Sequence, residues 1–275
     1  MSDQDSDGRV ISFAEAQAEA KARQAQAARA QARAQARRPS GEASKPWLTY
    51  AVIGLNAAVW LVMVGLGVDA FEPDGYTLLR WGGNLGIATI DGQWWRLLTA
   101  TFLHAGILHL AFNLYFAWVI GRLCEQIYGP AAYALVYLGS GLFASLVSIA
   151  WQPMVVSVGA SGALFGVFGA FLGFTIRRRD MLPPEFVSSV RRNALILIGI
   201  NLALGLAVPG IDVAAHAGGL AGGLAIGYAI ARLAEKPART PEEARKIKVR
   251  AIGLVGAATA VILVAGCFAV AVLRG

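Results

Sequence analysis

Ser161 and His216 are the two residues whose types and surroundings are best suited to chemistry. Ser161 lies in the apolar, glycine-rich stretch VVSVGASGALFGVFGAF (residues 155–171), and His216 lies in DVAAHAGGLAGGLAIG. A serine hydroxyl is a weak nucleophile until a neighbouring base accepts its proton. A histidine within ~2.6–3.2 Å does so, and typically contributes ~10²–10⁴-fold in rate. We therefore predict that the two residues form a Ser–His catalytic dyad.

A second group of polar side chains lies in HAGILHLAFN, residues 104–113. His109 and Asn113 are four residues apart and share one helix face, whereas His104 lies at or near the start of that helix. Acyl transfer develops an oxyanion, and each preorganised donor aimed at it is worth ~10²–10³-fold in rate. The Asn113 amide, the His109 ring N–H and the Ser161 backbone N–H are the predicted donors.

Each of these residues taken alone has a simpler explanation. A serine in a glycine-rich span is more often a packing residue, and an intramembrane histidine is more often a satisfied hydrogen-bonding group or a proton relay. That explanation weakens for the set, because serine, histidine and a His/Asn pair would have to coincide. No acid is placed to orient His216: Asp212 lies one turn outward, at the surface. A buried carboxylate would be costly to desolvate, so we predict a dyad without an acid.

The composition is that of a membrane protein. Of the 275 residues, 56% are hydrophobic and 15% are charged, and the mean hydropathy is +0.56. The net charge of +7 comes from basic residues that flank apolar segments and form no patch with interleaved aromatics, which argues against nucleic-acid binding. Cys124 and Cys267 have no metal-ligand spacing, so neither a metal nor a cofactor is expected.

The chain is predicted to be an all-α polytopic membrane protein. A bilayer core of ~30 Å needs ~20 helical residues. Seven apolar runs are predicted to span it, at 47–66, 101–121, 131–150, 159–176, 194–209, 212–233 and 252–273. The fourth and fifth are short, so they are expected to tilt little, thin the bilayer, or begin below the surface.

The distribution of basic residues predicts the orientation. With the N-terminus in the cytoplasm, all but three of the 24 Lys and Arg residues face the cytoplasm, the exceptions being Arg80, Arg96 and Arg274. The C-terminus is then outside. Spans four and six both run inward, which puts Ser161 and His216 in the outer half of the bilayer.

Two stripes of glycine are expected to bring these spans together. They consist of Gly162, Gly166, Gly169 and Gly173 in the fourth span, and of Gly219, Gly223 and Gly227 in the sixth. Small residues at such steps let helix backbones approach closely in lipid. The contact would hold the serine beside the histidine.

Segments outside the spans are predicted to anchor the protein. Residues 1–46 are rich in Ala, Gln and Arg without an apolar stripe, and we expect a retained, cytoplasmic helix that is either solvated or lies on the membrane surface. The external loop, 68–100, contains Trp81, Trp94 and Trp95, which are typical of an interfacial aromatic belt. Residues 234–251 form a basic linker able to contact anionic lipid.

At these motifs the sequence resembles the rhomboid family of intramembrane serine proteases. The resemblance rests on GASG (residues 159–162), HAGILHLAFN, the Trp95–Arg96 pair, and AHAGGLAGG with His216, Gly219 and Gly223. It covers about residues 47–233 and implies a six-helix core there. Residues 252–275 resemble the additional C-terminal helix of some members.

The resemblance also implies roles for individual residues. Ser161 would be the nucleophile, His216 the general base, and His109 and Asn113 the oxyanion-hole lining. The residues that would support them structurally are Gly159, Gly162, His104, Trp95, Arg96, Phe165, Gly219 and Gly223. Among these, Gly159 would keep the loop before the fourth span tight, and Trp95 and Arg96 would brace the first loop. Phe165 stands where many members carry a tyrosine packed against the base.

Three functions are compatible with these features. The first is a serine endopeptidase in a bacterial plasma membrane that cleaves single-pass transmembrane proteins near the outer face. The second is a non-proteolytic rhomboid-like protein that binds and escorts transmembrane clients, for which loss of the serine or histidine would be the mark. The third is a transporter with a histidine proton relay, which predicts inverted repeats or acidic residues in the spans; neither is visible.

Overall fold

The tail and the helical body form two separate units, Met1–Ser44 and Lys45–Gly275. A computed structural model describes residues 3–4, 10–11, 17, 21, 45–208 and 210–274. In the tail, strand β1 (Asp3–Gln4) pairs antiparallel with β2 (Val10–Ile11). Most of the helix predicted for the tail lies outside the described residues.

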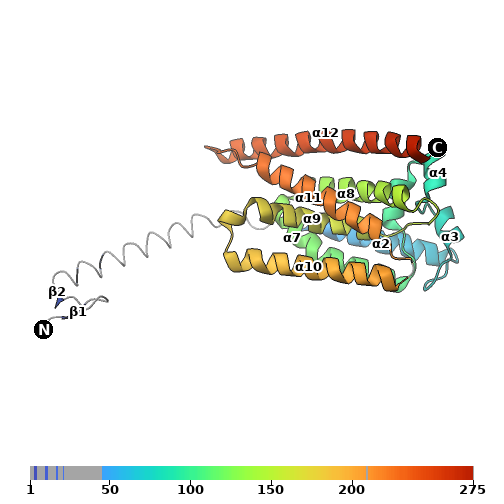
Figure 1. The fold of residues 1–275 in the computed structure, drawn as a ribbon, viewed down its shortest axis with the longest axis horizontal. Coiled ribbons are helices and arrows are strands. Elements are labelled where there is room, and N and C mark those ends of the chain that lie inside the picture. Colours follow the sequence, from blue (N-terminus) through green and yellow to red (C-terminus); the bar gives the residue numbers. More distant parts are fainter. Residues whose placement is uncertain are drawn as a thin grey trace. The chain divides into compact units, whose positions relative to one another are not determined.

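The second unit is a bundle of apolar helices, and all seven predicted spans are helical in it (Figure 1). Six stretches are long and apolar enough to cross a bilayer, and α9 is shorter and also apolar. The helices are α2 (Trp47–Gly65), α6 (Ile107–Phe116), the π-helical η2 (Ala117–Gly121), α7 (Arg122–Tyr128), α8 (Pro130–Trp151), α9 (Ser161–Arg177), α10 (Pro184–Ala207), α11 (Val213–Leu233) and α12 (Pro241–Arg274). The all-α polytopic prediction, with a seventh helix after the six-helix core, is confirmed.

Three helices have bounds that differ from the predicted spans. The second span begins at Ile107 instead of 101, because Gly106 adopts a φ of 103° that an α-helix does not allow. It then continues without a break through η2 and α7 to Tyr128. Helix α10 begins at Pro184, with proline in the first turn, and α12 begins at Pro241, so part of the predicted basic linker is helical.

The polar end of the second span explains its extra length. Glu125 of α7 is 1% exposed, and its carboxylate accepts hydrogen bonds from the backbone N–H groups of Leu48 and Thr49 and from the Thr49 hydroxyl. Those N–H groups belong to the first turn of α2, whose preceding Pro46 supplies no side-chain cap. A charge in one helix thus caps another.

The external loop is folded into short helices. These are α3 (Gly75–Arg80), α4 (Gly86–Ile90), α5 (Arg96–Thr99) and the 3₁₀ turn η1 (Ala100–Phe102); a further 3₁₀ turn, η3 (Arg179–Met181), precedes α10. The loop pairs with the segment that enters α9: Asn84 and Ser157 exchange backbone hydrogen bonds of 3.0 and 2.8 Å. Asn84 is fully buried and donates through its amide to the Ser145 carbonyl of α8.

Helices α9 and α11 are in backbone contact along their glycine stripes. A Cβ added to Gly219 would lie 1.9 Å from the Gly162 carbonyl oxygen, and one added to Gly223 would lie 1.8 Å from that of Gly166. No side chain larger than hydrogen fits at either position. Helix α8 packs against both α9 and α11, and α12 packs on α8. In Figure 1, α12 and α10 lie at opposite edges of the bundle.

Candidate active site

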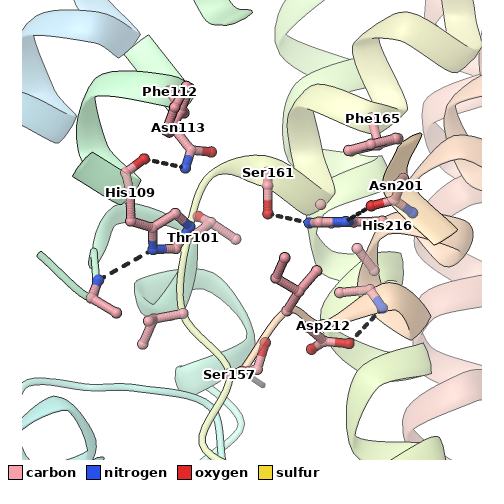
Figure 2. Close-up of a pocket in the computed structure, with 18 of the residues that line it drawn as sticks. Thr101, His109, Phe112, Asn113, Ser157, Ser161, Phe165, Asn201, Asp212 and His216 are labelled. Carbon is pink, nitrogen blue, oxygen red and sulfur yellow. Dashed lines mark hydrogen bonds between the residues drawn. The ribbon is translucent and has the colours of Figure 1, made fainter. Parts of the chain in front are cut away.

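Ser161 and His216 meet where α9 and α11 begin. Ser161 is the first residue of α9, and His216 is in the first turn of α11. The serine Oγ lies 2.7 Å from His216 Nε2, within hydrogen-bonding distance (Figure 2). Phe165, one turn after Ser161, stacks on the imidazole with ring centroids 4.5 Å apart and an interplanar angle of 13°. The predicted nucleophile and the predicted base are therefore in direct contact.

The second ring nitrogen of His216 has a partner that the sequence did not reveal. Asn201 of α10 places its Oδ1 2.5 Å from His216 Nδ1. Asp212, the only carboxylate near in sequence, instead accepts from the Ala215 N–H at 2.8 Å and from the Ser148 hydroxyl at 2.5 Å. Its carboxylate caps α11 and makes no hydrogen bond to the His216 imidazole in the described part of the chain. The backbone alone connects the two residues, since the His216 N–H donates to the Asp212 carbonyl at 3.1 Å.

His109 and Asn113 lie across the cavity from the base, on α6. The Ala105 N–H donates to His109 Nδ1 at 3.2 Å, so in the neutral ring Nε2 carries the proton and can act as a donor. That nitrogen faces Gly159: a Cβ added there would lie 2.8 Å from it and 3.6 Å from Ser161 Oγ. The Asn113 amide donates to the His109 carbonyl at 2.8 Å and retains a second N–H.

Gly159 shapes the turn that leads into Ser161. Its φ is 124°, a conformation that L side chains rarely adopt. Its N–H donates to the Ala100 carbonyl of η1 at 2.9 Å. Together with the Asn84–Ser157 pairing, this bond ties the segment before the nucleophile to the external loop. The loop therefore helps to position Ser161.

Of the other residues singled out in the sequence, Gly162 lines the cavity, whereas His104, Trp95, Arg96, Gly219 and Gly223 do not. His104 is fully buried behind His109, ring edge to face with centroids 5.2 Å apart, and neither of its ring nitrogens has a partner among the described residues. Arg96 donates to the carbonyls of Leu79 and Gly83 and lies 4.6 Å from the centre of the Trp95 ring. These contacts hold α3 and α5 of the loop together.

A cavity of about 610 Å³ opens beside the dyad. Its walls come from η1, α6, α8, α9, α10 and α11, and from the loops before α9 and α11. Ser161, His216, His109 and Asn113 all line it, as does Asn201. No group of three His, Cys, Asp or Glu side chains is arranged to hold a metal ion anywhere in the described residues. The site thus joins a serine hydroxyl, an imidazole and neutral hydrogen-bond donors around one space.

Comparison with known proteins agrees with this geometry. Residues 91–233, more than half of the chain, match the family model of the Rhomboid domain. The chain belongs to the rhomboid family. As a rhomboid with several membrane-spanning helices, it is an integral membrane protein.

Curated relatives of this rhomboid include bacterial and plant proteins. The chain is 38% identical over 176 residues to rhomboid protease GluP of Bacillus subtilis, covering 64% of this chain and 33% of GluP. It is 32% identical over 195 residues to rhomboid protease AarA of Providencia stuartii, covering 62% and 68%. It is 31% identical over 199 residues to RHOMBOID-like protein 1 of Arabidopsis thaliana, covering 63% and 50%. The match spans about a third of GluP and half of the plant protein.

Proposed function

We propose that this rhomboid is an intramembrane serine endopeptidase with Ser161 as nucleophile and His216 as general base. The observation that carries the proposal is the 2.7 Å contact between Ser161 Oγ and His216 Nε2 inside a cavity. As Oγ attacks a peptide carbonyl, Nε2 accepts its proton and then delivers it to the leaving amine. Water attacks the acyl-enzyme next, with His216 again the base, and Ser161 is regenerated.

Three neutral donors would stabilise the oxyanion of each tetrahedral intermediate. The Ser161 N–H is the first of α9, so it has no partner within its own helix. His109 Nε2–H and the second N–H of the Asn113 amide approach from α6. Because the cavity walls are largely apolar, each donor acts in a medium of low dielectric constant, where one such group is worth ~10²–10³-fold.

The substrate is proposed to be a single-pass transmembrane protein. The cavity is lined on one side by α6 residues Phe112 and Phe116 and on another by α10 residues Ile200 and Leu204, which favours entry of an apolar segment between these helices. A helical substrate must unwind locally, because its carbonyls are otherwise enclosed. By the distribution of basic residues, the site lies toward the outer face, with the N-terminus in the cytoplasm and, in this proposal, in a bacterial plasma membrane.

Labelling with a fluorophosphonate tests the proposal, combined with cleavage of a transmembrane reporter by the detergent-purified full chain. We expect both signals in the wild type and neither in Ser161→Ala or His216→Ala. Ser188→Ala, an exposed serine of α10, is the matched control and retains both. Cleavage that persists in Ser161→Ala overturns the proposal. Reporter binding without cleavage or labelling in the wild type would favour the escort function instead.

A further inference from the structure

We propose that Asn201 is the positioning residue of the base, so that the catalytic group is a Ser161–His216–Asn201 triad instead of a dyad. The inference rests on the proposed protease function and adds a residue to it. Asn201 Oδ1 lies 2.5 Å from His216 Nδ1, on the side of the imidazole opposite Ser161 (Figure 2). Asn201 also lines the cavity.

The packing of α10 on α11 places this contact. Asn201 and Gly205 are four residues apart and share one face of α10, and Val213 and His216 are three apart and share one face of α11. A Cβ added to Gly205 would lie 2.0 Å from Val213 Cγ2, so the Val213 side chain packs directly on the backbone of α10. That close approach, one turn away, brings the Asn201 amide to the imidazole.

The chemistry of the amide decides the state of the ring. A carboxamide oxygen accepts hydrogen bonds and cannot donate, so Nδ1 must carry the proton in the neutral ring. Nε2 is then unprotonated and directs its lone pair at Ser161 Oγ, as a general base requires. When Nε2 accepts the serine proton, Nδ1–H keeps its bond to Asn201. The proton moves only between Oγ and Nε2, and the amide exchanges none.

An amide suits this position better than an acid. An uncharged acceptor needs no counter-charge inside the bundle, whereas an isolated carboxylate would be costly to desolvate. The nearest acid, Asp212, is already engaged by Ser148 and by the first turn of α11. With Ser161 at one nitrogen, Asn201 at the other and Phe165 on the ring face, neither rotation nor tilt of the imidazole is free.

The test compares Asn201→Leu, Asn201→Asp and a control, Leu195→Ala, whose side chain on the same helix is 65% exposed. In Asn201→Leu we expect kcat for the reporter to fall about 10- to 100-fold with KM within about twofold, because the base loses its orientation. Asn201→Asp keeps an acceptor and is expected to recover much of kcat. Its carboxylate would stabilise the protonated ring, so the acidic limb of kcat/KM should move to higher pH. Leu195→Ala is expected to match the wild type.

A second readout is independent of catalysis. Long-range ¹H–¹⁵N spectra of the full chain labelled at histidine nitrogens report which ring nitrogen is protonated, and His216→Ala assigns the signals. We expect wild-type His216 to carry its proton on Nδ1, and Asn201→Leu to give a mixture of tautomers. A proton on Nε2 in the wild type, or an unchanged tautomer and kcat in folded Asn201→Leu, overturns the inference. Failure of the protease proposal would instead appear as absent cleavage with the Nδ1–H tautomer intact.

Discussion

The Phe165 ring lies parallel to the His216 imidazole, with an interplanar angle of 13° and centroids 4.5 Å apart. Such ring contacts are worth ~0.5–1.5 kcal/mol, equivalent to about 2- to 10-fold in rate when they hold a catalytic group. We expect Phe165→Leu to lower kcat/KM for a transmembrane reporter by that factor and Phe165→Tyr to retain activity. Phe174→Leu removes a ring that packs edge-on against Tyr128, away from the cavity, and serves as the control. Equal activity of the two leucine variants would contradict a role for the stacking.

The backbone contact between α9 and α11 predicts a sharp position dependence for alanine substitutions. Gly219→Ala would put a methyl group 1.9 Å from the Gly162 carbonyl oxygen, whereas a Cβ at Gly54 of α2 meets nothing within 4 Å. Overpacking of this kind costs ~1–3 kcal/mol, and replacing an unconstrained helical glycine is neutral or favourable. We expect Gly219→Ala to lower the Tm and abolish fluorophosphonate labelling, with Gly54→Ala unaffected. Thermal unfolding in detergent measures the first effect.

Glu125, which lies outside the cavity, is expected to stabilise the fold. Its carboxylate accepts from two backbone N–H groups and one hydroxyl in the first turn of α2. Removing a buried charged acceptor leaves these donors unpaired, at a cost of ~2–4 kcal/mol. We expect Glu125→Ala to unfold at clearly lower temperature, Glu125→Gln to be intermediate, and Glu72→Ala, in the exposed loop, to match the wild type. An unchanged Tm in Glu125→Ala would contradict the capping role.

We expect the turn at Asp69, which contacts the start of α6, to make the stability of the protein depend on pH. The backbone N–H groups of Glu72 and Phe71 donate to its carboxylate and lower the pKa of Asp69 below its ordinary value. The same turn seats α6, because the Ala70 carbonyl accepts from the Ile107 N–H at 2.8 Å. A lowered pKa means that the stabilisation is present above the ordinary Asp pKa and is lost as the pH falls through the folded-state value. Asp69→Asn should therefore lower the Tm at about pH 7, and the difference from the wild type should shrink as the pH falls below the ordinary Asp pKa.

Hydropathy alone was enough to identify the seven membrane helices, because each is an apolar run bounded by polar residues. Their ends were less predictable where a distant partner decides them. Helix α7 extends past Arg122 because Glu125 caps α2, a contact between residues 76 positions apart. The sequence of one segment does not show which distant residue it will contact. The start of α6 likewise depends on a backbone turn at Gly106. The residues on both sides of this glycine are mostly apolar, so hydropathy did not indicate the turn.

The site was predictable where residue types limit the chemistry and not where only geometry selects a partner. Serine and histidine on two glycine-striped helices indicate a reactive pair by residue type and position along the chain. Asn201 was not predicted, although it is the only polar side chain between 194 and 208. An amide inside the membrane is costly unless it is hydrogen-bonded. A single asparagine in an otherwise apolar span could therefore have been predicted to have a polar partner. Nothing comparable in the sequence indicates the contact between Asn84 of the external loop and Ser157 of the segment before α9.

The glycine contact between α9 and α11 determines when the conformational entropy of aligning Ser161 with His216 is lost. No side chains lie between the two backbones at Gly219 and Gly223, so there are no rotamers through which the helices could change their packing. Ser161 and His216, at the ends of these helices, therefore belong to one rigid body. Their alignment is completed once, when the chain folds, and under the proposed function it need not be repeated at each turnover. Any motion that admits a substrate must then occur in other helices, and Ser161 and His216 keep their arrangement during it.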